Sequence, residues 1–262
     1  MILFNFLFFV CTLSFANLLK SIQQSQVIFI TEEHTNMEDH RFQLYIIRML
    51  SNSNIRFVIA MEMFQTPFQK VLDDYIACRI EEEEMLEKTQ YRKRWGYDPK
   101  LYRDIWLFAK ERGIRIYAIN IPSELVSRIR EEGLSKVRDE NLPYPVVEQT
   151  QEEKERLKEF LKDHPKANEK TFLEIQNAWD NGMALSIARI LEENPGVKVV
   201  VFVGRGHAEN YQMGIPRVLR RLKPDVKMLI LDRKNYKDLR FSMDFSMESS
   251  SANSSAEPNC KP

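Results

Sequence analysis

The stretch "FITEEHTNMEDH", residues 29–40, places carboxylates and imidazoles directly after an apolar run. Two of the chain's four histidines, His34 and His40, stand here close to Glu32. An imidazole beside a carboxylate titrates near neutral pH, and both groups can hold a metal ion or move a proton. These residue types therefore predict one wall of a site for metal, haem or proton chemistry.

A purely structural interpretation competes for the other acidic residues of this stretch. Acidic side chains in the first turn of a helix interact favourably with the helix dipole, and Asn36 is well suited as the N-cap. We therefore expect Glu33, Glu38 and Asp39 to lie in a solvated loop or a first helical turn. His40 would lie on that helix, either packed at its rim or facing the site.

Five short apolar runs predict the strands that would position these residues. They are "QVIFIT" (26–31), "IRFVIAME" (55–62), "IRIYAINI" (114–121), "VKVVVFVG" (197–204) and "VKMLILD" (226–232). Each run is nearly continuous rather than alternating, which is typical of strands covered on both faces. Helical patterns separate the runs, so the sequence predicts an α/β fold with a parallel sheet and helices on both faces.

Two connections are too long for simple crossovers. Residues 63–113 and 122–196 carry helical patterns, and structureless loops of that length are rare in compact domains. We expect a large helical insertion in each, together capping the carboxyl edge of the sheet, within one α/β domain over residues 17–240. The eight glycines form no Gly-rich phosphate loop.

Ligands of open parallel sheets bind beyond the carboxyl ends of the strands. Glu32 and His34 follow the first run, Glu62 ends the second, Asn120 ends the third and His207 follows the fourth. A carboxylate in a buried type of run, such as Glu62, needs a partner. We therefore predict that these distant residues meet at one rim, with His34 and His207 also candidate ligands for a metal ion.

The composition of the chain and its two ends limit the classes of protein to which it can belong. Lys plus Arg and Asp plus Glu each number 38, and this balance argues against a general nucleic-acid-binding surface. The uncharged, apolar start, with Ser14-Phe15-Ala16 as a cleavage-like motif, predicts a signal peptide or anchor over residues 1–16. The protein would then be exported, periplasmic or membrane-associated. Residues 241–262 are Ser-rich and predict a disordered tail.

Five segments in the same order resemble the ChaN-like family of haem-binding, iron-regulated lipoproteins, which is related to the erythromycin-esterase-like proteins. The resemblance runs from about residue 17 to 232. The segments are "ITEEHTNMEDHRFQ", "AMEMFQTPFQKVLDDYIACRI", "RWGYDPKLYRDIWLFAKERGIRIYAINIP", "IQNAWDNGMALSIARIL" and "VFVGRGHAENYQMGIPRVLRR".

The resemblance implies haem as the cofactor and a homodimer that holds two haems face to face. It also implies membrane attachment and a part in iron acquisition. The family's Gly-Glu-x-His motif is matched at Glu32 and His34, with Thr31 in place of the glycine. The later histidine pair of the family reads Asp39-His40 here, so only half of it is present.

Further family positions extend the set of candidate residues. His207 in "GRGH" matches the second histidine motif, and Asp180 falls in "WDNGMA". The family's haem ligand is a tyrosine of the helical part, for which Tyr102 and Tyr144 are the candidates. The cofactor-binding residues implied are Glu32, His34, His40, Glu62, Asn120, His207, Tyr102 and Tyr144.

The sequence leaves three functions open. We expect the first, haem or iron binding. The alternative is a hydrolase in which His34 or His207 is the general base and Glu32 or Glu62 orients it or holds a divalent metal. Because no Gly-x-Ser-x-Gly motif supplies a nucleophile, that hydrolase would need an activated water. A scaffolding protein with a vestigial site is the third.

Overall fold

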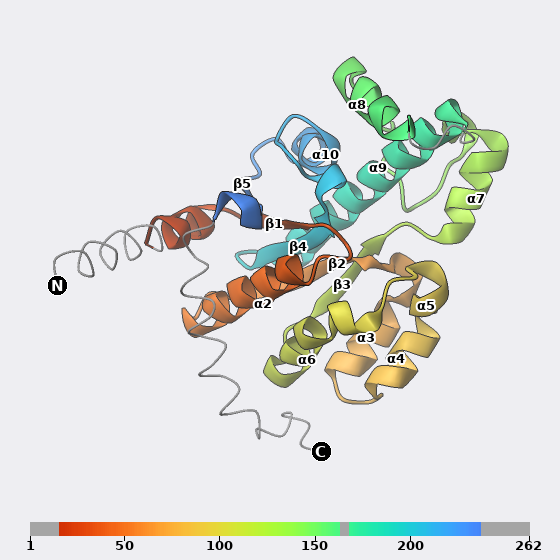
Figure 1. Ribbon diagram of the computed structural model, residues 1–262. Coiled ribbons are helices and arrows are strands. Elements are labelled where there is room, and N and C mark those ends of the chain that lie inside the picture. The colour runs from red at the N-terminus through yellow and green to blue at the C-terminus, as the bar shows by residue number, and fades with distance from the viewer. Residues whose placement is uncertain (1–15, 163–167, 237–262) are drawn as a thin grey trace.

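The fold is a five-stranded parallel sheet with helices on both faces, as predicted (Figure 1). The computed structural model describes residues 16–162 and 168–236. The strand order is β3-β2-β4-β1-β5, and every neighbouring pair is parallel. The strands are β1 (Val27–Glu32), β2 (Phe57–Gln65), β3 (Ile116–Asn120), β4 (Lys198–Gly204) and β5 (Met228–Leu231).

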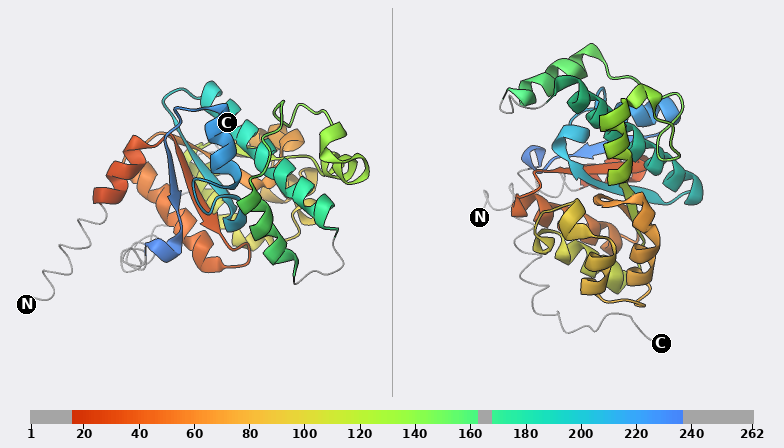
Figure 2. Two further views of the ribbon diagram at one scale, coloured as in Figure 1. Left: turned by 90° about the horizontal axis from the view of Figure 1, so that it is seen from above. Right: turned by 90° about the vertical axis from the view of Figure 1, so that its right-hand side faces the viewer.

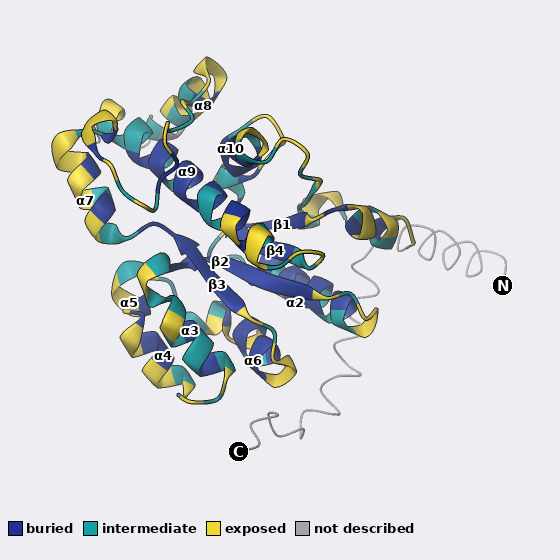
Figure 3. Ribbon diagram, turned by 180° about the vertical axis from the view of Figure 1, so that it is seen from behind, coloured by how far each residue is buried: buried dark blue, intermediate teal, exposed yellow. Residues whose placement is uncertain are grey.

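Alternate residues of the strands point into two separate apolar layers. Ile28 and Phe202 face the layer that contains helix α2 (Met37–Asn52), whereas Phe29 and Val201 face the layer on the other side. This second layer contains α9 (Glu169–Glu193) and α10 (Gly214–Leu222). The two layers explain why the strand sequences are continuously apolar, and β1 and β2 are buried along their whole length (Figure 3). The edge strand β5 is only partly buried before Leu231.

The long connection after β2 folds into short helices on the α2 side of the sheet (Figure 2). Large aromatic side chains, among them Trp106, Tyr91 and Phe64, pack in its interior. Its elements are η1 (Thr66–Phe68), α3 (Gln69–Ile76), α4 (Glu82–Lys88), α5 (Tyr91–Arg94), η2 (Pro99–Leu101) and α6 (Arg103–Arg112).

The connection after β3 is also helical, and it lies on the opposite side of the sheet. A third apolar cluster, formed by residues such as Ile121, Leu125 and Ile175, joins it to α9. Its elements before α9 are α7 (Ser123–Glu132), η3 (Leu134–Lys136) and α8 (Gln151–Leu161). Both long connections thus carry the helices that the sequence predicts.

Helix α2 begins where its sequence predicts. The Asn36 side chain accepts a hydrogen bond from the Glu38 backbone N–H at 3.0 Å, which caps the helix. The two faces of α2 differ in burial: Phe42 and Ile46 are fully buried, while Arg41 is exposed. The cap fixes the direction in which the chain leaves β1 and so positions the residues between Glu32 and Asn36.

No helix within residues 16–162 and 168–236 is long and apolar enough to cross a membrane. The predicted signal peptide or anchor over residues 1–16 lies, except for its last residue, outside the described residues. The predicted tail over residues 241–262 lies outside them as well.

Candidate functional site

The sheet topology brings three strand ends to one place. β4 lies between β1 and β2, and Gly204 at the end of β4 is the register partner of Glu32 at the end of β1. Glu62 is carried by β2 on the other side of β4. Residues that are far apart in sequence therefore converge around Gly204, at the carboxyl edge where parallel sheets bind their ligands.

Glu32 is the centre of the first half of this edge. It is buried, and one carboxylate oxygen accepts from the Tyr102 hydroxyl at 2.5 Å and contacts His34 Nδ1 at 2.8 Å. The other oxygen accepts from Gln43 Nε2 at 2.6 Å and lies 3.6 Å from His40 Nδ1. A buried carboxylate is tolerated only with partners of this kind.

Glu62 is the centre of the second half. Its Oε2 accepts from the Gly204 backbone N–H at 2.7 Å, and its Oε1 lies 3.4 Å from His207 Nε2. The Nδ1 atom of His207 is 2.6 Å from an oxygen of Asp180, which α9 supplies. The His34 ring lies over Gly204, where an added Cβ would be 2.9 Å from its Nε2 and 3.6 Å from Glu62. His34 and His207 thus approach the same carboxylate.

The surrounding carboxylates favour the charged form of both imidazoles, His207 and His34. Burial alone would lower the pKa of His207, but the charges of Glu62 and Asp180 raise it to about 9. Burial likewise opposes the charge on His34, yet its hydrogen bond to Glu32 and the charge of Glu62 raise its pKa. His207 therefore holds its proton at neutral pH, so it can donate a proton there but is poorly suited as the general base that the hydrolase alternative expects.

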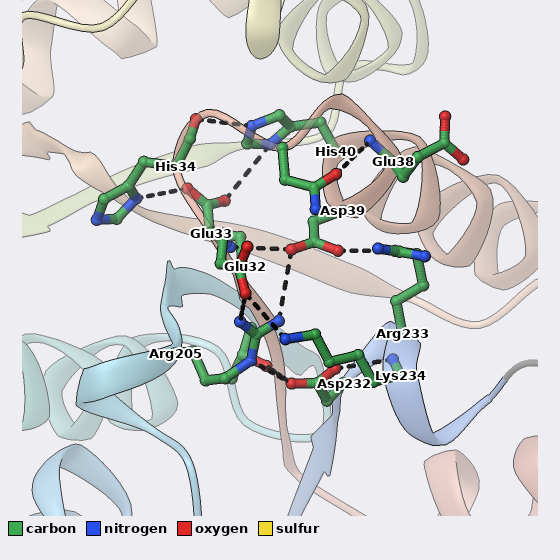
Figure 4. Close-up of polar contacts among 12 residues, drawn as sticks. Glu32, Glu33, His34, Glu38, Asp39, His40, Arg205, Asp232, Arg233 and Lys234 are labelled. Atoms are coloured by element: carbon green, nitrogen blue, oxygen red, sulfur yellow. Dashed lines mark hydrogen bonds and ion pairs between the residues drawn. The ribbon is translucent and has the colours of Figure 1, made fainter.

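Arg205, directly after β4, contacts acidic residues of the loop after β1, of α2 and of the segment after β5, beside this edge (Figure 4). Its guanidinium donates to Asp232 at 2.5 Å and to Glu33 at 2.6 Å, and it lies 3.5 Å from Asp39. Lys234 also donates to Glu33, at 2.9 Å. The loop after β1 is therefore held against the segments that follow β4 and β5.

Asp39 lies in the first turn of α2, as expected, but its side chain is fully buried rather than solvated. It accepts from Arg233 at 2.7 Å and from the Glu33 backbone N–H at 2.9 Å. The sequence could not show this, because Arg205 and Arg233 reach Asp39 from segments 166 and 194 residues away along the chain. Glu33 and Glu38 are partly solvated, as expected.

His40 and Asn120 lie at the edge but contact the protein itself. His40 Nε2 lies 3.0 Å from the His34 carbonyl oxygen, and its Nδ1 lies 3.2 Å from Gln43 Oε1. Asn120 donates to the Glu62 carbonyl at 3.1 Å. Both support neighbouring site residues in this structure, and their contact with a cofactor stays a prediction.

The two candidate tyrosines lie in different surroundings. Tyr102 is fully buried, its hydroxyl donates to Glu32, and burial together with the charge of Glu32 raises its pKa. Tyr144 is 75% exposed, and the Arg138 guanidinium lies 4.4 Å from its ring centroid. Of these two phenols, only that of Tyr144 is therefore open to an incoming ligand.

Aromatic side chains that the sequence did not single out line the edge. Trp95 and Tyr97 lie with their ring centroids 4.8 and 5.1 Å from that of His34, and Trp179 lies 6.3 Å from His207. Gln43 was missed as well, although it follows His40 by three residues and so shares its face of α2. The aromatic residues come from the long connections and leave no comparable signal in the sequence.

A cavity of about 530 Å³ lies elsewhere, between η3, the segment 137–150, α8 and α9. This volume is within the range of small-molecule sites. Apolar side chains and several cationic ones share its walls. Its lining residues are Leu134, Ser135, Arg138, Tyr144, Pro145, Val146, Glu148, Gln149, Lys154, Lys170, Leu173, Glu174 and Asn177.

The predicted metal site has no support in this geometry. Among the described side chains, no three or more His, Cys, Asp and Glu residues are arranged to hold a metal ion. His34 and His207 instead contact carboxylates through the nitrogens described above.

Residues 18–219 match a protein family described as "Haem-binding uptake, Tiki superfamily, ChaN". Among solved structures, ChaN of Campylobacter jejuni with cofacially bound haem superposes with a TM-score of 0.64 at 21% identity, covering 83% of this chain and 85% of that one. No protein with a curated description matches the sequence.

Two more distant structures share the fold. A mutant of the erythromycin esterase EreC in its open conformation gives a TM-score of 0.51 at 14% identity, covering 83% of this chain and 72% of its own. A succinoglycan biosynthesis protein gives 0.51 at 15% identity, covering 82% and 67%. At these identities the likeness concerns the fold alone.

Proposed function

Because this chain belongs to the haem-binding uptake family of the Tiki superfamily that contains ChaN, we propose that it binds haem, with Tyr144 as the iron ligand. The match covers most of the chain, from residue 18 to 219. Haem, when bound, would supply a flat apolar ring and an iron centre, and tyrosine is one of the residues that can ligate haem iron.

The cavity beside Tyr144 fits such a group. Tyr144 is largely exposed and lines the cavity, so its phenol can reach a ligand without any rearrangement of the core. Leu134, Val146 and Leu173 give the cavity an apolar wall suited to a porphyrin ring. This exposed phenol at a cavity of suitable size is the observation that carries the proposal.

The carboxyl edge suits the haem iron less well. Both ring nitrogens of His40 and of His207 lie close to oxygen atoms of the protein. His34 Nδ1 contacts Glu32, and its Nε2 packs over Gly204. A ligating role for any of these imidazoles would require breaking buried contacts of charged groups, which stabilise the fold.

Titration of the purified chain with haem tests the proposal. We expect a Soret band with a defined stoichiometry for the wild type, and Tyr144→Phe should shift the band and weaken binding by about tenfold or more, equivalent to about 1.4 kcal/mol. Tyr211→Phe is the matched control, because Tyr211 is also on the surface but does not line the cavity. An unchanged spectrum in Tyr144→Phe would remove Tyr144 as the ligand.

Haem binding of this kind would serve iron acquisition by an exported or membrane-associated protein. The family's description as haem uptake proteins supports this proposal, as does the apolar start of the sequence. A second copy of the chain could cover the outer face of a haem held at Tyr144, in keeping with the cofacial haems of the Campylobacter protein. Sedimentation with and without haem tests the dimer, and cell fractionation tests the location.

The carboxyl edge favours a second candidate function, acid–base hydrolysis. Two imidazole–carboxylate pairs, His34 with Glu32 and His207 with Asp180, meet at Glu62. Here His207 would supply a proton, while His34, with 26% of its side chain exposed, would face the substrate. Ester and peptide panels assayed with wild type and His34→Ala test this function, and it is excluded if the wild type shows no turnover above the variant.

A further inference from the structure

We infer that Lys154 binds a carboxylate of the ligand; this inference rests on the haem site proposed above. The cavity would then bind porphyrins with free propionates more tightly than their esters. Lys154 belongs to α8, is half-buried and lines the same cavity as Tyr144. Its ammonium group and the Tyr144 phenol are thus presented to one ligand from two different segments.

Lys154 differs in its ion pairing from Lys158 of α8 and from Lys162, the residue directly after the helix. Lys158 pairs with Glu169 at 2.8 Å and Lys162 with Glu159 at 2.5 Å. Within residues 16–162 and 168–236, Lys154 has no carboxylate within ion-pair distance. A bound carboxylate would offset the lost hydration of this half-buried ammonium through a charge-assisted hydrogen bond.

The other cations of the cavity already have protein partners. The Arg138 guanidinium donates to the carbonyls of Ser135 and Val137 and stacks on Tyr144. Lys170 lies 3.9 Å from Glu174 and is largely exposed, so water screens its charge. Lys154 is therefore the cation best placed to recognise a carboxylate.

An amide group on the wall of the cavity also indicates that a hydrogen-bond acceptor binds there. Gln149 lines the cavity, and its Nε2 atom is buried without a hydrogen-bond acceptor among the described residues. Buried donors are nearly always paired, so this one marks a place where an acceptor is missing. A ligand carboxylate in the cavity that Gln149 and Lys154 share would supply such an acceptor.

Comparison of haem with haem dimethyl ester tests this selectivity, because esterification removes the negative charges and leaves the ring and iron unchanged. We expect the wild type to bind haem about tenfold or more tightly than the ester, as expected for one charge-assisted bond. Lys154→Met should reduce that ratio to about twofold or less while the Soret maximum of its haem complex stays in place. The wild-type affinity for haem should also fall more steeply with added salt than that of the variant.

Lys158→Met is the matched control, because it removes a paired, exposed lysine from the same helix and should keep the wild-type ratio. Far-UV circular dichroism verifies that each variant is folded. A Lys154→Met protein that still prefers haem, or a control that loses the preference equally, overturns the inference while leaving haem binding intact. Absence of a Soret band with either porphyrin would instead refute the haem proposal itself, and the Lys154 inference with it.

Discussion

The carboxyl edge of the sheet and the cavity beside α8 are both rich in charged residues, but the polar groups of the two regions differ in how far they are paired within the protein. At the edge, Glu32, Asp39 and Glu62 are buried and each contacts several protein groups. At the cavity, Tyr144 is exposed and Lys154 has no carboxylate partner in the described part of the chain. Internal pairing stabilises the folded chain, whereas unpaired groups beside a cavity are available to a ligand.

This difference separates two kinds of mutational effect. Substitutions at the edge should change mainly the free energy of unfolding, because they leave buried charges without partners. Substitutions of Tyr144 and Lys154 at the cavity should change mainly ligand affinity, because neither side chain is part of the buried core. The following predictions test this separation, in order of decreasing effect on stability.

Glu32→Gln should have the largest effect on stability, a loss of about 3–5 kcal/mol in the free energy of unfolding. The amide cannot serve as the charged acceptor for Tyr102 and His34 together. Urea unfolding followed by circular dichroism measures this loss. The control Glu33→Gln, at a half-exposed position of the neighbouring ion cluster, should lose less than about 1 kcal/mol. Equal losses in the two variants would contradict the comparison.

The contribution of His207 to stability should depend on pH. Its folded-state pKa of about 9 lies above the ordinary value of 6.5, so the folded state binds the proton more tightly. The stabilisation is complete below about pH 6.5 and is lost as the pH rises through 9, amounting to up to about 3 kcal/mol. The difference in unfolding free energy between wild type and His207→Gln, measured from pH 6 to 9.5, should shrink accordingly. A difference that is constant across this range would refute the pairing with Glu62 and Asp180.

Gly204→Ala should destabilise the protein by about 1–3 kcal/mol. Its added Cβ would come within 2.8 Å of the His34 ring, so that the ring or the strand end must move. Gly206→Ala is a close control, since a Cβ there meets nothing within 4 Å, and it should stay within about 0.5 kcal/mol of wild type. Thermal unfolding compares the two, and a larger loss for Gly206→Ala would argue against close packing at the edge.

Tyr144→Phe and Lys154→Met should have the smallest effects on stability, within about 0.5 kcal/mol of wild type. Tyr144 is on the surface, and Lys154 leaves no described carboxylate unpaired when its charge is removed. The same urea titrations in the absence of haem provide the measurement. Losses comparable to that of Glu32→Gln would show that the cavity is part of the structural core after all.

Local patterns were sufficient for much of the fold. The five apolar runs correspond to β1–β5, although β2 continues to Gln65, three residues beyond its predicted end. The continuous apolar character of these runs reflects layers on both faces of the sheet, and the prediction of an α/β parallel fold was confirmed. The cap at Asn36 was predictable for the same reason, because capping depends on neighbours two or three residues away.

The partners of the polar residues were less predictable. The sequence places Glu32, His34, Glu62 and His207 at strand ends, and parallel topology is enough to bring such ends to one edge. It does not reveal that Asp39 is buried between arginines from two later segments. Nor does it distinguish the buried Tyr102 from the exposed Tyr144, since both lie in the long connections between strands.

By itself, the sequence determined the order of strands and helices, the family and the residues delivered to the carboxyl edge. Only the tertiary structure decided which of these residues bind one another and which phenol and ammonium group stay open to a ligand. The physical reason is the range of the interactions involved. Periodicity and capping act over a few neighbouring residues, whereas burial and ion pairing depend on side chains that folding brings together from distant parts of the chain.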